Sequence, residues 1–376
     1  MTTDLTADAP SLVEPVPLTD LALMHAPIAA EVEQGLAGVM AAGAFVGGPA
    51  VGRFEDAFAA YSGRAHCVGV ANGTDALEMA LRACDVTAGD EVIIPANTFI
   101  ATAEAVVRAG GVPVPVDVTA GALLIDPERA AAAITPRTRV LLPVHLFGQQ
   151  APMAPLRDLA AERGLVLIED AAQAQGSTQN GQGIGTGAVA AATSFYPGKN
   201  LGAYGDAGAV VCDDPAVAAR LRRIGNHGCE RKYVHSEFGF TSRLDTFQAV
   251  VLEAKLRHLD GWNAQRARAA ALYDELLADS EVAVPVTAPG NRHVWHLYVV
   301  RVRRRESVLR ALNAAGIGAA VHYPIPVHRQ PAFAGTARSP LPVTERASEE
   351  ILSLPMFPGI TPDQQERVVR SLARAL

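Results

Sequence analysis

Short apolar runs alternate with helix-like segments through the first half of the chain. Each run is four or five residues long, which is typical of a buried strand. The runs lie at residues 67–70, 91–95, 112–116, 140–144 and 165–168. Helical segments fall between them, one opening at Gly73 and others over about 99–109 and 155–163. This alternation predicts an α/β fold in which helices cover both faces of a mostly parallel sheet.

Three further helices are predicted outside this region. One covers about 27–43 and ends before the Gly47-Gly48-Pro49 turn. A long one is expected over 245–278, because apolar residues from Phe247 to Trp262 recur at helical spacing. The last helix follows Thr361-Pro362-Asp363-Gln364, which has the spacing of a capping box.

The order of elements predicts a large domain and a smaller one. Residues 26–260 would form the large domain and residues 261–376 a smaller α+β domain at the C-terminus. The smaller domain is expected to contain a strand over 295–302, a helix over about 305–314 and a strand over 317–323. Residues 1–25 begin with a stretch rich in Thr, Asp and Pro, and we expect them to be disordered or extended.

Composition narrows the class of protein. Hydrophobic residues make up 49% of the 376 positions and charged residues 19%, which is enough apolar sequence for a large core. The net charge of −7 argues against a nucleic-acid or anionic-membrane surface. The uncharged stretch Gly35–Gly52 holds six glycines and Pro49, so it predicts a helix end and a loop rather than a membrane span. Because no leader pattern or CxxC spacing occurs, we expect a cytoplasmic protein with reduced cysteines.

Lys199 lies in an unusual chemical setting. The chain has only three lysines, and the other two, Lys232 and Lys255, lie in charged stretches where solvated side chains are expected. No Asp, Glu, Lys or Arg occurs between Asp170 and Lys199, which favours desolvation of the amine and a lowered pKa. Asp170 follows the apolar run 165–168, at a strand end. A Schiff-base lysine and an acid are the protein groups that pyridoxal phosphate (PLP) requires, so we expect this cofactor.

Other residues suit the remaining parts of the cofactor. Gly73 and Thr74 follow a strand and start a helix, where free backbone amides and a hydroxyl bind phosphate, although an ordinary capped helix has the same pattern. Gln173 has the chemistry to hydrogen-bond the ring oxygen O3′. Phe99 has the shape to stack on the ring, and a core phenylalanine is the alternative. Asp170 has the alternative of capping a helix.

Two further patterns have simpler explanations. Gly185-x-Gly187-x-x-Ala190 imitates a dinucleotide-binding fingerprint, but a turn rather than a strand precedes it. His293 and His296 have no third zinc-type ligand nearby in sequence, so we interpret both as structural and expect no metal.

These motifs together resemble the DegT/DnrJ/EryC1/StrS family of PLP-dependent nucleotide-sugar aminotransferases, from about residue 40 to the end. The matching segments are residues 72–77, 143–148, 169–174, 194–205, 242–245 and 322–324. The resemblance implies the architecture of fold-type-I, aspartate-aminotransferase-like enzymes. It also implies a homodimer with active sites between the subunits.

The resemblance assigns a role to each candidate residue. Lys199 would bind PLP covalently, and Asp170 would pair with the pyridinium nitrogen. The other implied contacts are Gly73, Thr74 and Ser194 with the phosphate, Gln173 with O3′, Phe99 with the ring face, and Tyr196, His322 and Tyr323 with the sugar. The family often has Asn at the position of Thr241, where it reaches the cofactor phosphate of the partner subunit. The shorter Thr241 side chain puts that contact in question.

The segment 194–202 looks most like the subgroup that aminates C3 of dTDP-3-keto-6-deoxyhexoses in antibiotic deoxysugar biosynthesis, with L-glutamate as the expected amino donor. Amination at C4 of a 4-keto nucleotide-sugar, or of another ketone such as a cyclitol, is the enzymatic alternative. A PLP-fold dehydratase would have histidine in place of Lys199. A non-catalytic regulator would be expected to lack Lys199 or Asp170.

Overall fold

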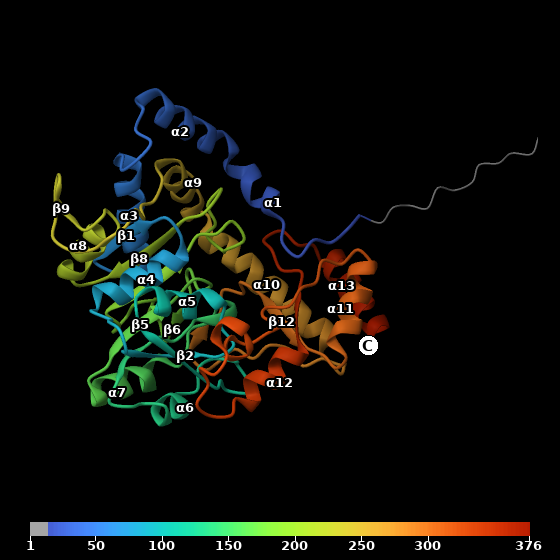
Figure 1. Ribbon diagram of the computed structural model, residues 1–376. Coiled ribbons are helices and arrows are strands. Elements are labelled where there is room, and N and C mark those ends of the chain that lie inside the picture. The colour runs from blue at the N-terminus through green and yellow to red at the C-terminus, as the bar shows by residue number, and fades with distance from the viewer. Residues whose placement is uncertain (1–13) are drawn as a thin grey trace, which may run out of the picture.

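The computed structural model describes residues 14–376, and a seven-stranded sheet forms its centre (Figure 1). In spatial order the strands are β1 (His66–Val70), β8 (Gly208–Cys212), β7 (Ala190–Ser194), β5 (Val166–Asp170), β4 (Thr138–Leu141), β2 (Glu91–Pro95) and β3 (Val112–Val116). Every neighbouring pair from β7 to β3 is parallel, whereas β8 is antiparallel to both β1 and β7. The predicted α/β fold with a mostly parallel sheet is confirmed.

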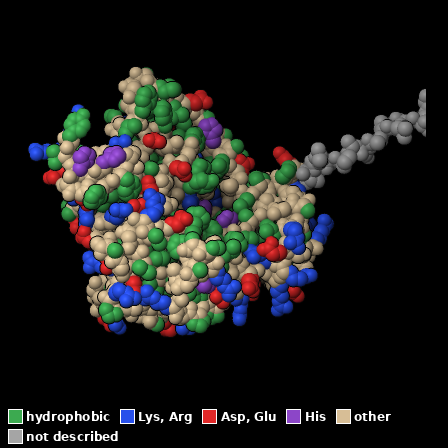
Figure 2. Space-filling model, viewed as in Figure 1, with side chains coloured by type: hydrophobic (Ala, Val, Ile, Leu, Met, Phe, Trp, Pro, Cys, Tyr) green, Lys and Arg blue, Asp and Glu red, His purple; other side chains and the backbone are tan. Residues whose placement is uncertain are grey.

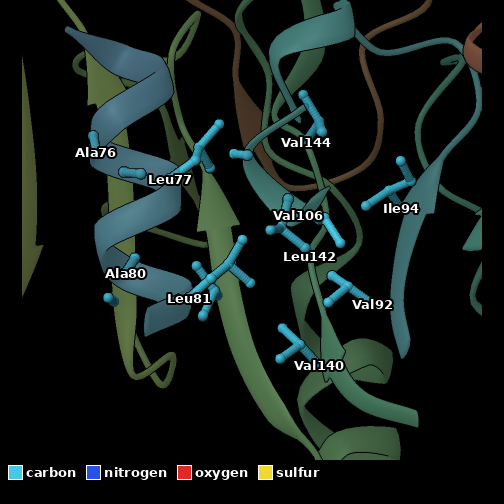
Figure 3. Packing of buried hydrophobic residues seen from close by; sticks show 14 of the residues in the cluster. Ala76, Leu77, Ala80, Leu81, Val92, Ile94, Val106, Val140, Leu142 and Val144 are labelled. Atoms are coloured by element: carbon cyan, nitrogen blue, oxygen red, sulfur yellow. The ribbon is translucent and has the colours of Figure 1, made fainter. Parts of the chain in front are cut away.

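Helices cover both faces of this sheet. One face packs against α4 (Gly73–Ala83), α5 (Ile100–Arg108) and α8 (Pro215–Ile224), the other against α3 (Pro49–Ser62), α6 (Pro127–Ala132), α7 (Met153–Arg163) and α9 (Thr246–Leu256). Successive strand residues point to opposite faces of the sheet. Val92 and Ile94 pack in the hydrophobic cluster that contains α4 and α5, whereas Ile93 packs in the cluster that contains α6 and α7. Figure 3 shows Leu77 and Leu81 of α4 pointing toward the sheet. Such two-sided burial is typical of parallel sheets.

The C-terminal part packs beside the sheet, and α10 (Leu259–Leu277) connects the two (Figure 1). It contains α11 (Arg305–Ala314), α12 (Pro342–Glu350), α13 (Pro362–Ala375) and the antiparallel strands β12 (Tyr298–Arg301) and β13 (Ile351–Leu354). The capping box predicted at Thr361 and Gln364 is present at the start of α13. The main apolar cluster continues from Val68 in β1 to Ile351 in β13, so the core crosses the expected boundary at 260/261.

Shorter elements complete the chain. They are α1 (Leu21–His25), α2 (Ala29–Ala42), the 3₁₀ helices η1 (Ala26–Ile28), η2 (Leu146–Gly148), η3 (Val327–Arg329) and η4 (Pro331–Phe333), and the strand pairs β6 (Thr178–Gln179) with β11 (Asn291–Arg292) and β9 (Cys229–Arg231) with β10 (Val234–His235). Within residues 14–376, no helix combines the length and apolarity needed to cross a bilayer. Acidic and basic side chains are interspersed on the face seen in Figure 2.

The prediction of one long helix over 245–278 is wrong in one respect, because the segment forms two helices. The amide of His258 donates to the carbonyl of Lys255 at 2.9 Å, three residues back instead of four, and this closes α9. α10 then begins at Leu259, and the amide of Trp262 bonds to the carbonyl of His258. No proline marks the break, so the apolar spacing alone did not reveal it.

The strand predicted over 317–323 in the C-terminal part is also wrong. Residues 317–323 make only isolated bridges, because Gly318 donates to Val16 and the amide of Val16 bonds to Gly316. The backbone groups of Gly316 and Gly318 are thus bonded to the N-terminal segment and are not available to pair with a neighbouring strand. Val16 is buried in the C-terminal core, residues 14–20 form no helix, and Leu21–His25 forms α1. The prediction for residues 1–13 lies outside the described chain.

Candidate active site

A cavity of about 660 Å³ opens where the sheet meets the C-terminal part. Ten of the eleven predicted site residues line it: Gly73, Thr74, Phe99, Asp170, Gln173, Ser194, Tyr196, Lys199, His322 and Tyr323. Asp170 ends β5 and Ser194 ends the neighbouring parallel strand β7. Carboxyl ends of parallel strands meet at one edge of a sheet, which is where ligands bind in folds of this kind.

Lys199 lies in a closed loop that follows β7. The amide of Ala203 donates to the carbonyl of Phe195 at 2.7 Å, and the amide of Lys199 donates to the carbonyl of Tyr196 at 2.8 Å. The side chain of Lys199 is partly buried and faces the cavity. Burial lowers the pKa of Lys199 to about 8, and the charge of Asp170 acts in the opposite direction. The desolvated amine expected from the uncharged stretch is therefore present.

Asp170 is buried and lines the same cavity as Lys199. Its Oδ2 accepts a hydrogen bond from Thr102 Oγ1 at 2.7 Å, and its Oδ1 accepts one from the amide of Ala172 at 3.1 Å. Burial raises the pKa of the Asp170 carboxyl, whereas these two hydrogen bonds and the nearby Lys199 lower it. The result is an acid held in one orientation by two donors.

The start of α4 lines the cavity with residues suited to an anion. Asn72 caps this helix by accepting from the amide of Asp75 at 2.8 Å, and its carbonyl takes the amide of Ala76. The first two helix amides, of Gly73 and Thr74, have no partner within the helix and suit an anion. A Cβ on Gly73 would lie 2.5 Å from the Cβ of Ser194, so only glycine fits between α4 and β7.

Aromatic and neutral polar groups form the opposite wall. The rings of Phe99 and Tyr323 lie 5.2 Å apart, and the Tyr323 hydroxyl accepts a hydrogen bond from Gln173 Nε2 at 3.0 Å. Gln173 Oε1 accepts from the amide of Phe147. His322 contacts Ser353 Oγ at 2.8 Å, and burial together with Lys199 lowers its pKa to about 4. His322 is therefore neutral near pH 7.

Several residues that line the cavity were missed at the sequence level, among them Thr98, Thr102, Arg266 and His296. Thr102 and Arg266 had no recognisable motif, and His296 was interpreted as purely structural. His296 Nδ1 contacts Asn200 Oδ1 at 3.2 Å, and burial holds its pKa well below the usual range. Arg266 is buried and donates to the carbonyls of Trp295 and Met356. Spacing does carry a signal for Thr102, since Thr98 and Thr102 are four residues apart at a helix start.

One predicted placement differs from the structure, and one predicted site residue lies outside the cavity. Lys255 is not solvated: it is 2% exposed, donates to the carbonyl of Gly202 at 2.7 Å and lies over the ring of Tyr204. Thr241 is exposed and lies outside the cavity of its own subunit, with its hydroxyl 2.5 Å from His227 Nε2. No group of three metal-ligating side chains occurs within residues 14–376.

Comparison with known proteins identifies the family. A sequence profile of the DegT/DnrJ/EryC1/StrS aminotransferase family matches residues 27–373. The chain belongs to this family. It is 47% identical over 357 residues, 94% of each chain, to the dTDP-3-amino-3,4,6-trideoxy-alpha-D-glucose transaminase of Streptomyces venezuelae. It is 46% identical to the erythromycin biosynthesis sensory transduction protein EryC1 of Saccharopolyspora erythraea, over 95% of this chain and 98% of the relative.

A solved structure of this aminotransferase family agrees over almost the whole chain. S. venezuelae DesV, solved in complex with a ketimine intermediate, superposes with a TM-score of 0.94 at 46% identity, covering 96% of this chain and 98% of that one. The protein is thus a sugar aminotransferase that uses PLP. The residues present fit this cofactor: a lysine of lowered pKa, a buried carboxylate, and a helix start at Gly73 whose free amides suit a phosphate.

Proposed function

We propose that this aminotransferase transfers the amino group of L-glutamate to C3 of a dTDP-linked 3-keto-6-deoxyhexose. The observation that carries the proposal is the shared cavity of Lys199 and Asp170, in which the amine has a lowered pKa and the acid is fixed by hydrogen bonds. The C3 position is supported by the S. venezuelae relative, whose name specifies a 3-amino sugar.

Each residue of the cavity has a chemical task in this proposal. When bound, PLP would supply an electron sink and a carbonyl-equivalent carrier for the amino group. Lys199 Nζ would hold it covalently, and the free Lys199 amine would accept the proton from the α-carbon of the amino donor. In the second half of the reaction the same nitrogen delivers a proton to the sugar carbon that receives the amine. Asp170 keeps a proton on the pyridine nitrogen.

The remaining residues bind and orient. Gly73, Thr74 and Ser194 hold the cofactor phosphate, Phe99 lies against the ring, and Gln173 contacts the ring oxygen. Tyr196, His322 and Tyr323 contact the sugar. Because His322 is neutral near pH 7, it does not add a charge beside Lys199, and it offers the sugar hydroxyls a hydrogen-bonding partner.

We also propose a homodimer in which Thr241 serves the partner subunit. Thr241 is exposed and does not line the cavity of its own subunit, which supports a contact outside that subunit. It pairs with Asn226 and His227, at the start of the segment 226–240 that contains β9 and β10, and in this segment Tyr233 is 82% and Phe238 96% exposed. Large exposed aromatic side chains of this kind are frequent at protein interfaces.

The test offers matched 3-keto and 4-keto dTDP-sugars with L-glutamate and compares kcat/KM. A pocket that presents C3 is expected to favour the 3-keto sugar by on the order of a hundredfold, because a reacting carbon misplaced by about 1 Å loses that much rate. NMR of the product identifies the aminated carbon, and Lys199→Ala is the inactive control. Equal or faster turnover of the 4-keto sugar would contradict the C3 assignment and leave the aminotransferase activity standing.

A regulatory role is the competing function, and EryC1 carries a regulatory name. Retention of Lys199 and Asp170 in one cavity favours catalysis. Addition of L-glutamate alone to the holoenzyme separates the two: an aminotransferase releases 2-oxoglutarate and its cofactor absorbance changes, whereas a regulator without catalysis releases none.

A further inference from the structure

The carboxylate of Asp170 has a single side-chain donor within the described chain, and it is Thr102. Thr102 Oγ1 lies 2.7 Å from Asp170 Oδ2, while the second oxygen is bonded to the amide of Ala172 at 3.1 Å. The amide belongs to the backbone two residues after the acid, so no side chain supplies it. The hydroxyl of Thr102 is therefore the side-chain contact that holds this carboxylate from another element of the fold.

The hydroxyl of Thr102 is itself hydrogen-bonded to a second hydroxyl, that of Thr98. Thr98 Oγ1 is 2.7 Å from Thr102 Oγ1, and both residues are buried, with exposures of 2% and 0%. An ionised carboxylate only accepts hydrogen bonds, so Thr102 must donate its one hydroxyl proton to Asp170. Thr102 can then only accept from Thr98. The hydrogen bonds therefore have one polarity: Thr98 donates to Thr102, and Thr102 donates to Asp170.

The two threonines belong to the segment that also presents Phe99. Thr98 and Phe99 precede α5, and Thr102 lies in the first turn of that helix. Valine has nearly the shape of threonine and would satisfy apolar burial at either position without placing a polar group there. The buried hydroxyls therefore serve a polar partner, and that partner is Asp170.

We propose that Thr102, oriented by Thr98, is a positioning residue that fixes the Asp170 carboxylate toward the ring nitrogen of PLP and keeps it ionised. The proposal rests on the role of Asp170 given under the proposed function. Thr102 itself touches no reacting atom; it acts through Asp170.

The effect has a defined sign. Burial raises the pKa of Asp170, and the hydrogen bond from Thr102 is the largest influence that lowers it. Without that bond the carboxyl holds its own proton more tightly and stabilises a protonated ring nitrogen less. A hydrogen bond to a charged group corresponds to about a ten- to hundredfold change in such an equilibrium.

The experiment measures the ring nitrogen directly. Holoenzyme reconstituted with ¹⁵N-labelled PLP is titrated with pH, and the ¹⁵N chemical shift reports the protonation of that nitrogen. We expect Thr102→Val to lower the proton affinity of the nitrogen about tenfold or more, and Thr102→Ser, which keeps the hydroxyl, to restore most of it. Thr98→Val is expected to change it in the same direction by a smaller factor.

Each outcome decides between defined possibilities. An unchanged titration in Thr102→Val, or the same loss in Thr102→Ser, overturns the proposal, because the hydroxyl then has no role. If Thr102→Val does not fold, Thr98→Val decides, and an unchanged titration there contradicts the orientation of Thr102. Asp170→Asn separates this result from the proposed function: if it too leaves the nitrogen unchanged, the assignment of Asp170 fails, whatever Thr102 does.

Discussion

Two lysines of this protein have lowered pKa values but differ in what surrounds their amines. Burial lowers the pKa of both Lys199 and Lys255 to about 8. Lys199 lines the cavity with Asp170, whereas Lys255 lies outside it and donates to the carbonyl of Gly202, in the loop that carries Lys199. A lowered pKa therefore does not by itself identify the reactive lysine, and access to the cavity does.

The first prediction concerns the site of cofactor attachment. Borohydride reduction of the holoenzyme followed by peptide mapping is expected to place the pyridoxyl label on Lys199. Lys199→Ala is expected to lose the label and turnover while keeping its circular dichroism spectrum. Detection of the label on Lys232 or Lys255 in the native enzyme would falsify the assignment.

The second prediction concerns stability and Lys255. Its pKa is about 8 in the folded protein and near 10.5 when unfolded, so the unfolded chain binds more protons between these values. Lys255 therefore adds stability as pH rises through this window. We expect the free energy of unfolding of the wild type, relative to Lys255→Met, to grow by about 1–3 kcal/mol between pH 8 and 10 in urea titrations. The exposed Lys232→Met is the control, and a Lys255→Met difference as flat as that control would contradict the burial of the charge.

At the scale of elements, local signals predicted most of the sheet and its helices. The apolar run 91–95 became β2, and Gly73 starts α4, because both depend on neighbours in sequence. The predictions that failed concern residues whose structure depends on partners far away in the sequence. Residues 317–323 form no strand, because Gly316 and Gly318 bond to Val16. Lys255 is buried because Tyr204 and Gly202 lie against it. The same limit hid Thr102, whose role depends on Asp170, 68 residues later.

The third prediction tests the helix start that receives the phosphate. Gly73→Ala would place its Cβ 2.5 Å from the Ser194 Cβ and push α4 away from β7. We expect the dissociation constant of PLP to rise at least tenfold, since the close approach of the backbone amides is lost. Gly52→Ala is the matched control, because a Cβ at this position in α3 meets nothing within 4 Å. Equal PLP affinity in both variants would show that α4 does not hold the phosphate.

The fourth prediction concerns the loop before α9. If Thr241 reaches the cofactor phosphate of the partner subunit, Thr241→Asn extends that reach and strengthens PLP binding by at most about 1.5–3 kcal/mol, the value of one hydrogen bond to a charged group. Thr241→Val is expected to weaken it. Fluorescence titration of the apoenzyme with PLP measures both. Unchanged or weaker binding by Thr241→Asn would remove the proposed contact.

At the scale of the whole molecule, two buried carboxylates of the sheet region hold the C-terminal part. Glu91, at the start of β2, accepts two hydrogen bonds from Arg338, at 2.7 and 2.8 Å. Asp117 accepts from the amides of Val343 and Thr344 at the start of α12. His322 and Tyr323 begin the segment that these contacts anchor. The part of the cavity wall formed by His322 and Tyr323 is thus positioned by contacts at a distance from it.

The last prediction tests this anchor through pH. Arg338, Thr135 and Arg137 lower the pKa of Glu91 to about 2, below its usual value of 4.5. A carboxyl with a lowered folded pKa stabilises the protein above pH 4.5, and this stability is lost as pH falls toward 2. Glu91→Gln is therefore expected to lower the free energy of unfolding by about 1–3 kcal/mol at pH 7. This value is smaller than the full pKa shift implies, because solvent screens the two arginine partners, which are partly exposed.

Urea titrations from pH 7 to pH 2 measure this difference. The gap between wild type and Glu91→Gln should close as pH falls, whereas Glu366→Gln, in an exposed pair with Arg370, should show almost none at any pH. A gap that persists unchanged at pH 2 would mean that Glu91 acts through its shape rather than its charge. Because Arg338 is joined to His322 by only sixteen residues of chain, we also expect Glu91→Gln to raise KM for the sugar more than it lowers kcat.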